Sequence, residues 1–274
     1  MTDSQCYERA VDWLRDADGL LITAGAGMGV DSGLPDFRGN EGMWAAYPAL
    51  GDARIPFQSI ANPDAFKTDP TLAWGFYGHR LSLYRHIEPH GGFAILRRWA
   101  QRMEQGAFVF TSNVDGQFQK AGFPEETVAE CHGSIHFLQC AQPCSQAIWP
   151  ADGFEPQVDP VACRLLNALP RCPRCSALGR PNVLMFYDWS WLDSREERQR
   201  ARLDAWLRGC TRRVVVELGA GTSLPTVRRF SERCGPRVIR INSREPDIDP
   251  DRGVGLRGGA RDVLAALDRL WTAR

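Results

Sequence analysis

The strongest constraint on the fold is an alternation of short apolar runs with segments of helical periodicity. Each run ends in small or polar residues and predicts a strand; the runs cover 20–23, 108–111, 127–131, 183–186, 214–218 and 238–241. Apolar residues at helical spacing lie at 6–14, 93–103, 194–207 and 260–271, and a Ser194-x-x-Glu197 capping box opens the third of these. The alternation favours the α/β class, with a Rossmann-like parallel sheet and helices on both faces.

Two stretches interrupt this alternation. Residues 36–91 combine aromatic residues with prolines and predict a loop followed by a helical module. Residues 139–180 hold two close cysteine pairs and little periodicity, and predict a small separate domain. The Rossmann-like domain is therefore expected in three parts, 1–35, 92–138 and 181–274, with the two stretches as insertions.

Composition limits the possible partners. The 33 basic residues balance the 33 acidic ones among 274, so no excess positive charge favours nucleic acid or an anionic membrane. The apolar runs are far shorter than the roughly 20 residues of a membrane span, and the charged N-terminal region is unlike a secretory leader. We therefore expect a cytoplasmic monomer with no nucleic-acid or membrane partner.

The residues that follow the predicted strands are the candidate site. Gly25-Ala26-Gly27 follows the first strand, and glycines there let a backbone approach a diphosphate, although a bare tight turn has the same pattern. Polar residues follow the other strands, and a turn explains each of them singly; they are Asn113, Asp115, His132, Ser223 and Asn242. Carboxyl ends of parallel strands meet at one edge, so convergence there indicates chemistry on a dinucleotide.

The cysteines suggest a metal. Disulfides rarely persist in a reducing compartment, so nine cysteines need another explanation. Two close pairs can surround one structural zinc ion, as in a zinc ribbon; they are Cys140 with Cys144 and Cys172 with Cys175. The alternatives are that one pair is merely buried, or that Cys163 replaces a ligand.

In the order of these pieces the chain resembles the sirtuins, a family of NAD-dependent protein deacylases. The matching segments are Gly25-Ala26-Gly27, 32–39, Thr111-Ser112-Asn113-Val114-Asp115, His132-Gly133-Ser134, the four cysteines, Gly221-Thr222-Ser223 and Ile241-Asn242. The resemblance covers nearly the whole chain. It implies that NAD and an acylated lysine of a protein or peptide give nicotinamide, O-acyl-ADP-ribose and free lysine.

The resemblance also implies roles for individual residues. His132 would be the catalytic base, a role that suits imidazole, and Asn113 would act beside it. The residues implied to bind NAD are Gly25, Ala26, Gly27, Asp36, Phe37, Arg38, Asn113, Val114, Asp115, Gly221, Thr222, Ser223 and Asn242. Val183 and Phe186 would bind the substrate, as would Tyr77 and Arg80, which resemble the Tyr-x-x-Arg of sirtuins that remove succinyl groups. Residues three apart share a helix face, so both could reach one carboxylate, although a core tyrosine with an ion-paired arginine is the alternative.

Several residues depart from the family pattern and leave other functions open. Ser112 replaces a glutamine, Phe118 a histidine and Tyr187 a glycine of the segment that pairs with substrate. ADP-ribosyl transfer or NAD hydrolysis at the same cofactor site is therefore one alternative. A non-catalytic NAD-sensing module is a second.

Overall fold

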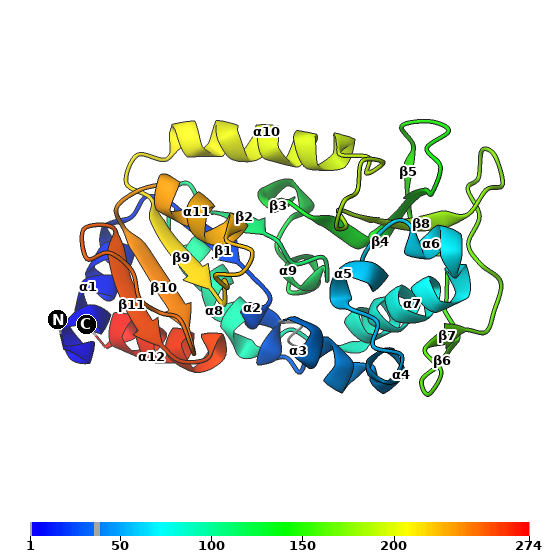
Figure 1. The fold of residues 1–274 in the computed structure, drawn as a ribbon. Coiled ribbons are helices and arrows are strands. Elements are labelled where there is room, and N and C mark those ends of the chain that lie inside the picture. The colour runs from blue at the N-terminus through cyan, green and yellow to red at the C-terminus, as the bar shows by residue number, and fades with distance from the viewer. Residues whose placement is uncertain (1, 36–38, 274) are drawn as a thin grey trace.

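The computed structural model describes residues 2–35 and 39–273. Its larger sheet has the order β11-β10-β9-β1-β2-β3, and every neighbouring pair is parallel (Figure 1). The strands are β1 (Leu20–Ala24), β2 (Ala107–Thr111), β3 (Val128–Glu130), β9 (Val214–Leu218), β10 (Val238–Asn242) and β11 (Gly253–Arg257). This is the Rossmann-like parallel sheet that the alternation predicts.

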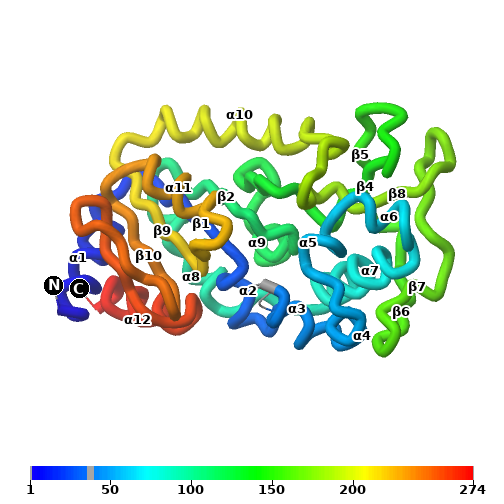
Figure 2. The backbone as a smooth tube through the Cα atoms, viewed as in Figure 1, coloured from blue at the N-terminus to red at the C-terminus, as the bar shows by residue number. Residues whose placement is uncertain are grey.

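Helices cover both faces of this sheet because alternate strand residues point to opposite sides. Leu20 and Ile22 of β1 pack in the core beneath α1 (Asp3–Asp16), α8 (Gly91–Ala100) and α12 (Ala260–Thr272). Leu21 packs in a second cluster, beneath α10 (Ser194–Gly209) and α11 (Thr226–Arg233). The helix α1 contacts α12, and both ends of the chain lie at that edge of the molecule (Figure 2).

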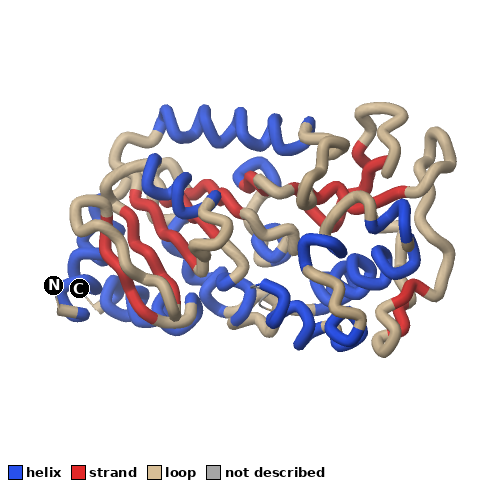
Figure 3. Tube along the Cα trace, in the orientation of Figure 1, coloured by secondary structure: helices blue, strands red, loops and turns tan. Residues whose placement is uncertain are grey.

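The helical module and a three-stranded antiparallel sheet form the other half of the molecule, around a core of their own. The module contains α3 (Gly39–Ala46), α4 (Pro48–Asp52), α5 (Phe57–Ile60), α6 (Ala65–Thr68) and α7 (Pro70–His86). The small sheet has the order β5-β4-β8, from β4 (Gly133–Cys140), β5 (Ile148–Pro150) and β8 (Gly179–Val183). Figure 3 shows that loops dominate the stretch between β4 and β8, where β6 (Val158–Asp159) and β7 (Arg164–Leu165) form a short hairpin.

Short helical turns and one long helix complete the connections. The turns are α2 (Gly27–Val30), α9 (Gln117–Lys120) and the 3-10 turn η1 (Glu125–Thr127). The long helix α10 runs across both halves (Figure 1), and its Arg195 guanidinium lies 4.2 Å from the ring centre of Phe137 in β4. The small sheet is thereby held beside the carboxyl ends of the large one.

Three expectations from the sequence are wrong. Residues 184–186 are not a strand: β8 ends at Val183, and the Leu184 amide instead donates to the His132 carbonyl oxygen. The sixth strand of the large sheet is β11, whose Gly253 and Gly255 weaken the sequence signal. A Cβ on either glycine would lie 2.2 Å from a carbonyl oxygen, so packing requires both. The capping box is absent because Ser194 lies inside α10 and Asp193 is the N-cap residue, with no side-chain cap.

Candidate active site

The candidate site lies where the order of strands in the large sheet reverses. From β1 the sheet continues through β2 and β3 on one side, and through β9, β10 and β11 on the other. The loops after β1 and β9 touch, since the Gly27 amide donates to the Gly219 carbonyl oxygen at 3.0 Å. Gly219 has φ +58°, and a Cβ there would lie 2.4 Å from Gly27. Ligands of such sheets bind at this switch point.

A line of contacts joins the strand ends across the sheet. The His132 ring, after β3, hydrogen-bonds the Ser112 backbone, after β2. The Asn113 side-chain amide donates to the Gly25 carbonyl oxygen at 3.0 Å, and Gly25 packs against Ala220. On the far side, the Asn242 amide donates to the Ala220 carbonyl oxygen at 2.9 Å. The structure therefore brings His132, the glycine loop and Asn242 to one edge, as chain order alone could not.

The other residues expected to bind NAD divide into three groups. Ala26, Thr222 and Ser223 are exposed at this edge, and a Cβ on Gly221 would meet open space. Val114 is instead buried in the core of the second half, and its carbonyl oxygen accepts from the Ile135 amide. Asp36, Phe37 and Arg38 lie outside the described residues.

Burial controls the ionisation of two titratable side chains at this edge, His132 and Asp115. It lowers the pKa of His132, partly offset by the bond to Ser112, so the ring is neutral at pH 7 and can accept a proton. Burial raises the pKa of Asp115 to about 6, with a further increase from the negative charge of Glu130 and a decrease from Arg80. Asp115 also accepts a hydrogen bond from the Gln117 amide at 2.9 Å.

We expect this raised pKa to make stability depend on pH. Because the folded pKa of Asp115 is about 6 against an ordinary 3.8, the folded state binds more protons between these values. The free energy of unfolding should then fall as pH rises through that window. Urea unfolding should show Asp115→Asn gaining about 2 to 3 kcal/mol over the native protein at pH 7, and the gain vanishing near pH 4. A difference that is constant with pH would contradict the assignment.

The helix α7 packs close to the loop after β2: it contacts β4, and the Gln117 side chain donates to the Ile87 carbonyl oxygen at its C-terminal end. Tyr77 and Arg80 are both buried, and the Arg80 carbon Cζ lies 5.5 Å from the centre of the Tyr77 ring. Tyr77 interacts electrostatically with the buried ion pair of Arg180 and Asp188, and Arg80 with Asp115. The two residues thus adjoin different parts of the site, the segment after β8 and the loop after β2.

The segment after β8 adjoins the candidate base. Besides the bond from Leu184 to His132, the Phe186 amide donates to the Ala61 carbonyl oxygen at 2.9 Å, and the Phe186 ring packs on Phe57. Val183 is buried. Tyr187 keeps a left-handed conformation with φ +56° and is 73% exposed. Tyrosine therefore occupies a backbone conformation that favours glycine.

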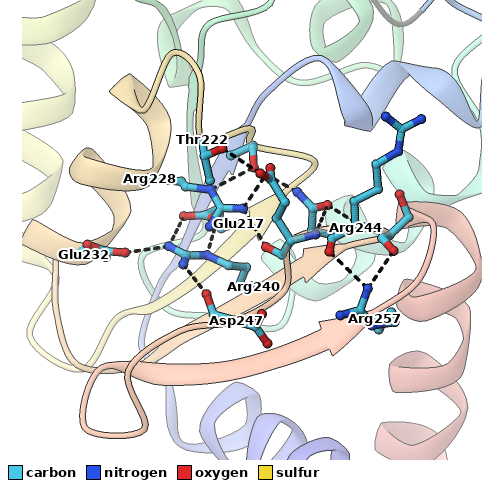
Figure 4. Close-up of polar contacts among 12 residues, drawn as sticks. Glu217, Thr222, Arg228, Glu232, Arg240, Arg244, Asp247 and Arg257 are labelled. Atoms are coloured by element: carbon cyan, nitrogen blue, oxygen red, sulfur yellow. Dashed lines mark hydrogen bonds and ion pairs between the residues drawn. The ribbon is translucent and has the colours of Figure 1, made fainter. Parts of the chain in front are cut away.

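A network of ion pairs and hydrogen bonds that the sequence did not indicate stabilises the loops after β9 and β10 (Figure 4). Arg240 of β10 pairs with the buried Glu217 of β9 and, at 2.8 Å, with Glu232 of α11. Arg228 donates to the Ala220 carbonyl oxygen at 3.0 Å and to the Glu245 carbonyl oxygen at 2.6 Å. The Thr222 hydroxyl donates to the Glu245 carboxylate at 2.6 Å. These bonds hold the two loops together at the edge of the site.

The four predicted metal ligands form one cluster. All four sulfur atoms of Cys140, Cys144, Cys172 and Cys175 lie within 4.8 Å of one another. Two of the separations are 3.7 Å, far beyond a disulfide and close to the roughly 3.8 Å edge of a tetrahedron with 2.3 Å zinc–sulfur bonds. Cys163 is instead buried in the core against α7. The donor set and spacing fit a structural zinc ion.

Three residues near the site carried no distinctive sequence signal. Glu130 is buried and raises the pKa of Asp115, Tyr84 accepts a hydrogen bond from Arg80, and His136 bonds the Asp115 carbonyl oxygen at 2.9 Å. Glu130 precedes the strand end by two residues, so a search confined to strand ends misses it. Tyr84 follows Arg80 by one helical turn, and that i,i+4 spacing is the signal that could have found it.

This fold and this edge define an α/β protein with a glycine loop at the switch point of its parallel sheet and a four-cysteine cluster that fits a structural zinc ion. The Sir2 family model matches residues 25–200, and the chain belongs to that family. It is 32% identical to an NAD-dependent protein deacylase of Pyrococcus furiosus, over 90% of each chain. It is 31% identical to one of Methylococcus capsulatus, over 93% of this chain and 92% of the relative. A Sir2 homologue solved with NAD aligns with TM-score 0.69 and 25% identity, over 97% of this chain and 94% of that one.

Proposed function

We propose that this protein is an NAD-dependent protein-lysine deacylase, which releases nicotinamide, O-acyl-ADP-ribose and the free lysine. The observation that carries the proposal is the line of contacts from His132 through Asn113 and Gly25 to Asn242. The line joins the loop that carries an imidazole to the glycine loop after β1, which could approach a diphosphate. Two relatives that match over nearly their whole length are named NAD-dependent protein deacylases, and this supports the proposal.

The residues at this edge fit NAD. The loops after β1 and β9 pack closely on each other, and Gly221 borders open space that a diphosphate could occupy. Asn242 and the exposed Ser223 would line the adenosine end. Asn113 and Asp115 would hold the nicotinamide ribose and the amide. When bound, NAD supplies the sugar carbon that receives the acyl oxygen and the nicotinamide that leaves.

His132 would move the proton. A neutral ring can accept a proton from a ribose hydroxyl, because burial lowers the pKa of His132. The loop after β8 would carry the acylated lysine, because Leu184 is bonded directly to the His132 carbonyl oxygen. The substrate partner is accordingly an acyl-lysine protein or peptide.

The zinc ion would act only on structure. Four cysteine ligands close the coordination sphere, so no position remains for water or substrate. The cluster closes the stretch between β4 and β8, and these strands lead directly to His132 and to Val183. Zinc would therefore hold the substrate segment in register with the base.

No helix among residues 2–35 and 39–273 is long and apolar enough to cross a membrane.

The proposed enzyme removes acidic acyl groups as well as acetyl groups. Arg80 is a buried cation that interacts electrostatically with Asp115, and a guanidinium can grip a carboxylate through two parallel hydrogen bonds. Tyr77 lies beside it on the same helix and adjoins the segment after β8. A succinyl chain fits this chemistry.

Mass spectrometry of the products tests the proposal. The protein would be incubated with NAD and with acetylated, succinylated or unmodified forms of one peptide. We expect O-acyl-ADP-ribose and deacylated peptide from the first two and no NAD consumption with the third. ADP-ribosylated peptide, or free ADP-ribose from NAD alone, would favour the alternative of transfer or hydrolysis, which the short Ser112 and the exposed Tyr187 suggest.

A further inference from the structure

Arg80 is a buried cation that lies among three aromatic rings of α7. Only 8% of the residue is exposed. Its Cζ atom lies 5.2 Å from the ring centre of Phe76 and 5.5 Å from those of Tyr77 and Tyr84. The electron-rich faces of these rings stabilise a guanidinium that has lost its hydration.

One directional bond adds to this enclosure. The Arg80 Nε–H donates to the Tyr84 hydroxyl oxygen at 2.9 Å, one helical turn further along α7. Tyr84 is itself 5% exposed. A ring face attracts a cation without fixing its rotation, whereas a hydrogen bond at Nε sets the plane of the guanidinium and the direction of its terminal nitrogens.

We propose that Tyr84 is a positioning residue for acidic acyl substrates, acting through its hydrogen bond to Arg80. With Nε bonded to Tyr84, a substrate carboxylate meets Arg80 end-on, through the two terminal nitrogens. This inference rests on the proposed deacylase function and adds to it the residue that aims the arginine.

Asp115 is an anion of the protein that could compete with the substrate carboxylate for Arg80. Both Arg80 and Tyr84 interact electrostatically with that carboxyl group, so the protein supplies an anion of its own near the cation. An arginine that is free to rotate would lose selectivity, because it could turn from the substrate toward Asp115. The bond to Tyr84 opposes that rotation.

Steady-state kinetics of Tyr84→Phe test the proposal, because this change removes the hydroxyl and keeps the ring. We expect the ratio of kcat/KM for succinyl-lysine to kcat/KM for acetyl-lysine to fall about five- to tenfold, mainly through a higher KM for the succinyl peptide. Tyr47→Phe is the matched control. It removes the hydroxyl of another buried tyrosine, which packs on Phe76 and is bonded to His79 at 2.8 Å, and it should leave the ratio unchanged.

A double-mutant cycle separates positioning from a merely structural role. In an Arg80→Met background, adding Tyr84→Phe should have no further effect on the KM for the succinyl peptide, because Tyr84 acts through Arg80. Equal losses on both peptides, or additive effects in the cycle, would overturn the proposal while leaving deacylation intact. A native protein that removes neither acyl group would overturn both proposals.

Discussion

Replacing His132 with alanine is expected to lower the production of O-acyl-ADP-ribose by about 10²- to 10⁴-fold, the usual contribution of a general base. The neutral ring beside the Ser112 backbone would be the proton acceptor that the proposed reaction requires. Nicotinamide release and O-acyl-ADP-ribose formation should be measured separately by mass spectrometry. The loss should be confined to formation of the acylated product if NAD still binds.

A matched histidine provides the control. His86 is exposed at the end of α7 and bonds the Ser82 carbonyl oxygen at 2.7 Å, so His86→Ala should retain full activity. Undiminished O-acyl-ADP-ribose from His132→Ala would show that another group moves the proton.

Replacing Cys172 with serine is expected to remove zinc and to lower stability substantially. Metal binding in such sites is coupled to folding, and loss of about 5 kcal/mol corresponds to a fall in Tm of about 10 to 20 °C for a domain of this size. Elemental analysis should give about one zinc per chain for the native protein and little for the variant. Thermal unfolding with and without a chelator measures the accompanying destabilisation.

Cys6 is the control for this experiment. It lies on α1, outside the four-cysteine cluster, so Cys6→Ser should keep both the zinc and the Tm. Freshly purified, reduced native protein without zinc would contradict the metal assignment. So would a Cys172→Ser variant that retains a full complement of metal.

Much of the large sheet could be predicted from its strands. Runs such as 214–218 and 238–241 are buried on both faces of a parallel sheet, and that burial favours mostly apolar sequence. The buried charges within them, Glu217 and Arg240, pair with each other. The failures have a common cause. Gly253 and Gly255 of β11 are dictated by neighbouring backbone, and residues 184–186 leave the sheet because their amide partners lie elsewhere. Neither contact is local in sequence.

Part of the candidate site could also be predicted from the sequence. Strand ends directed attention to Asn113, His132 and Asn242, because parallel strands present their carboxyl ends at one edge. Tyr84 could have been found from its i,i+4 spacing to Arg80. Glu130 and the ion pairs around Arg240 were not predictable, since buried charges acquire their roles from neighbours that the fold supplies. The raised pKa of Asp115 belongs to the same class.

The sequence by itself determined the α/β class, the glycine loop, the polar strand ends and the four metal ligands, because each depends on local pattern or fixed spacing. Tertiary structure alone decided which strand ends touch, which way Arg80 is aimed, and how far burial shifts the ionisation of Asp115 and His132. Those properties depend on distance through space and on exclusion of water, and neither is written in the order of residues along the chain.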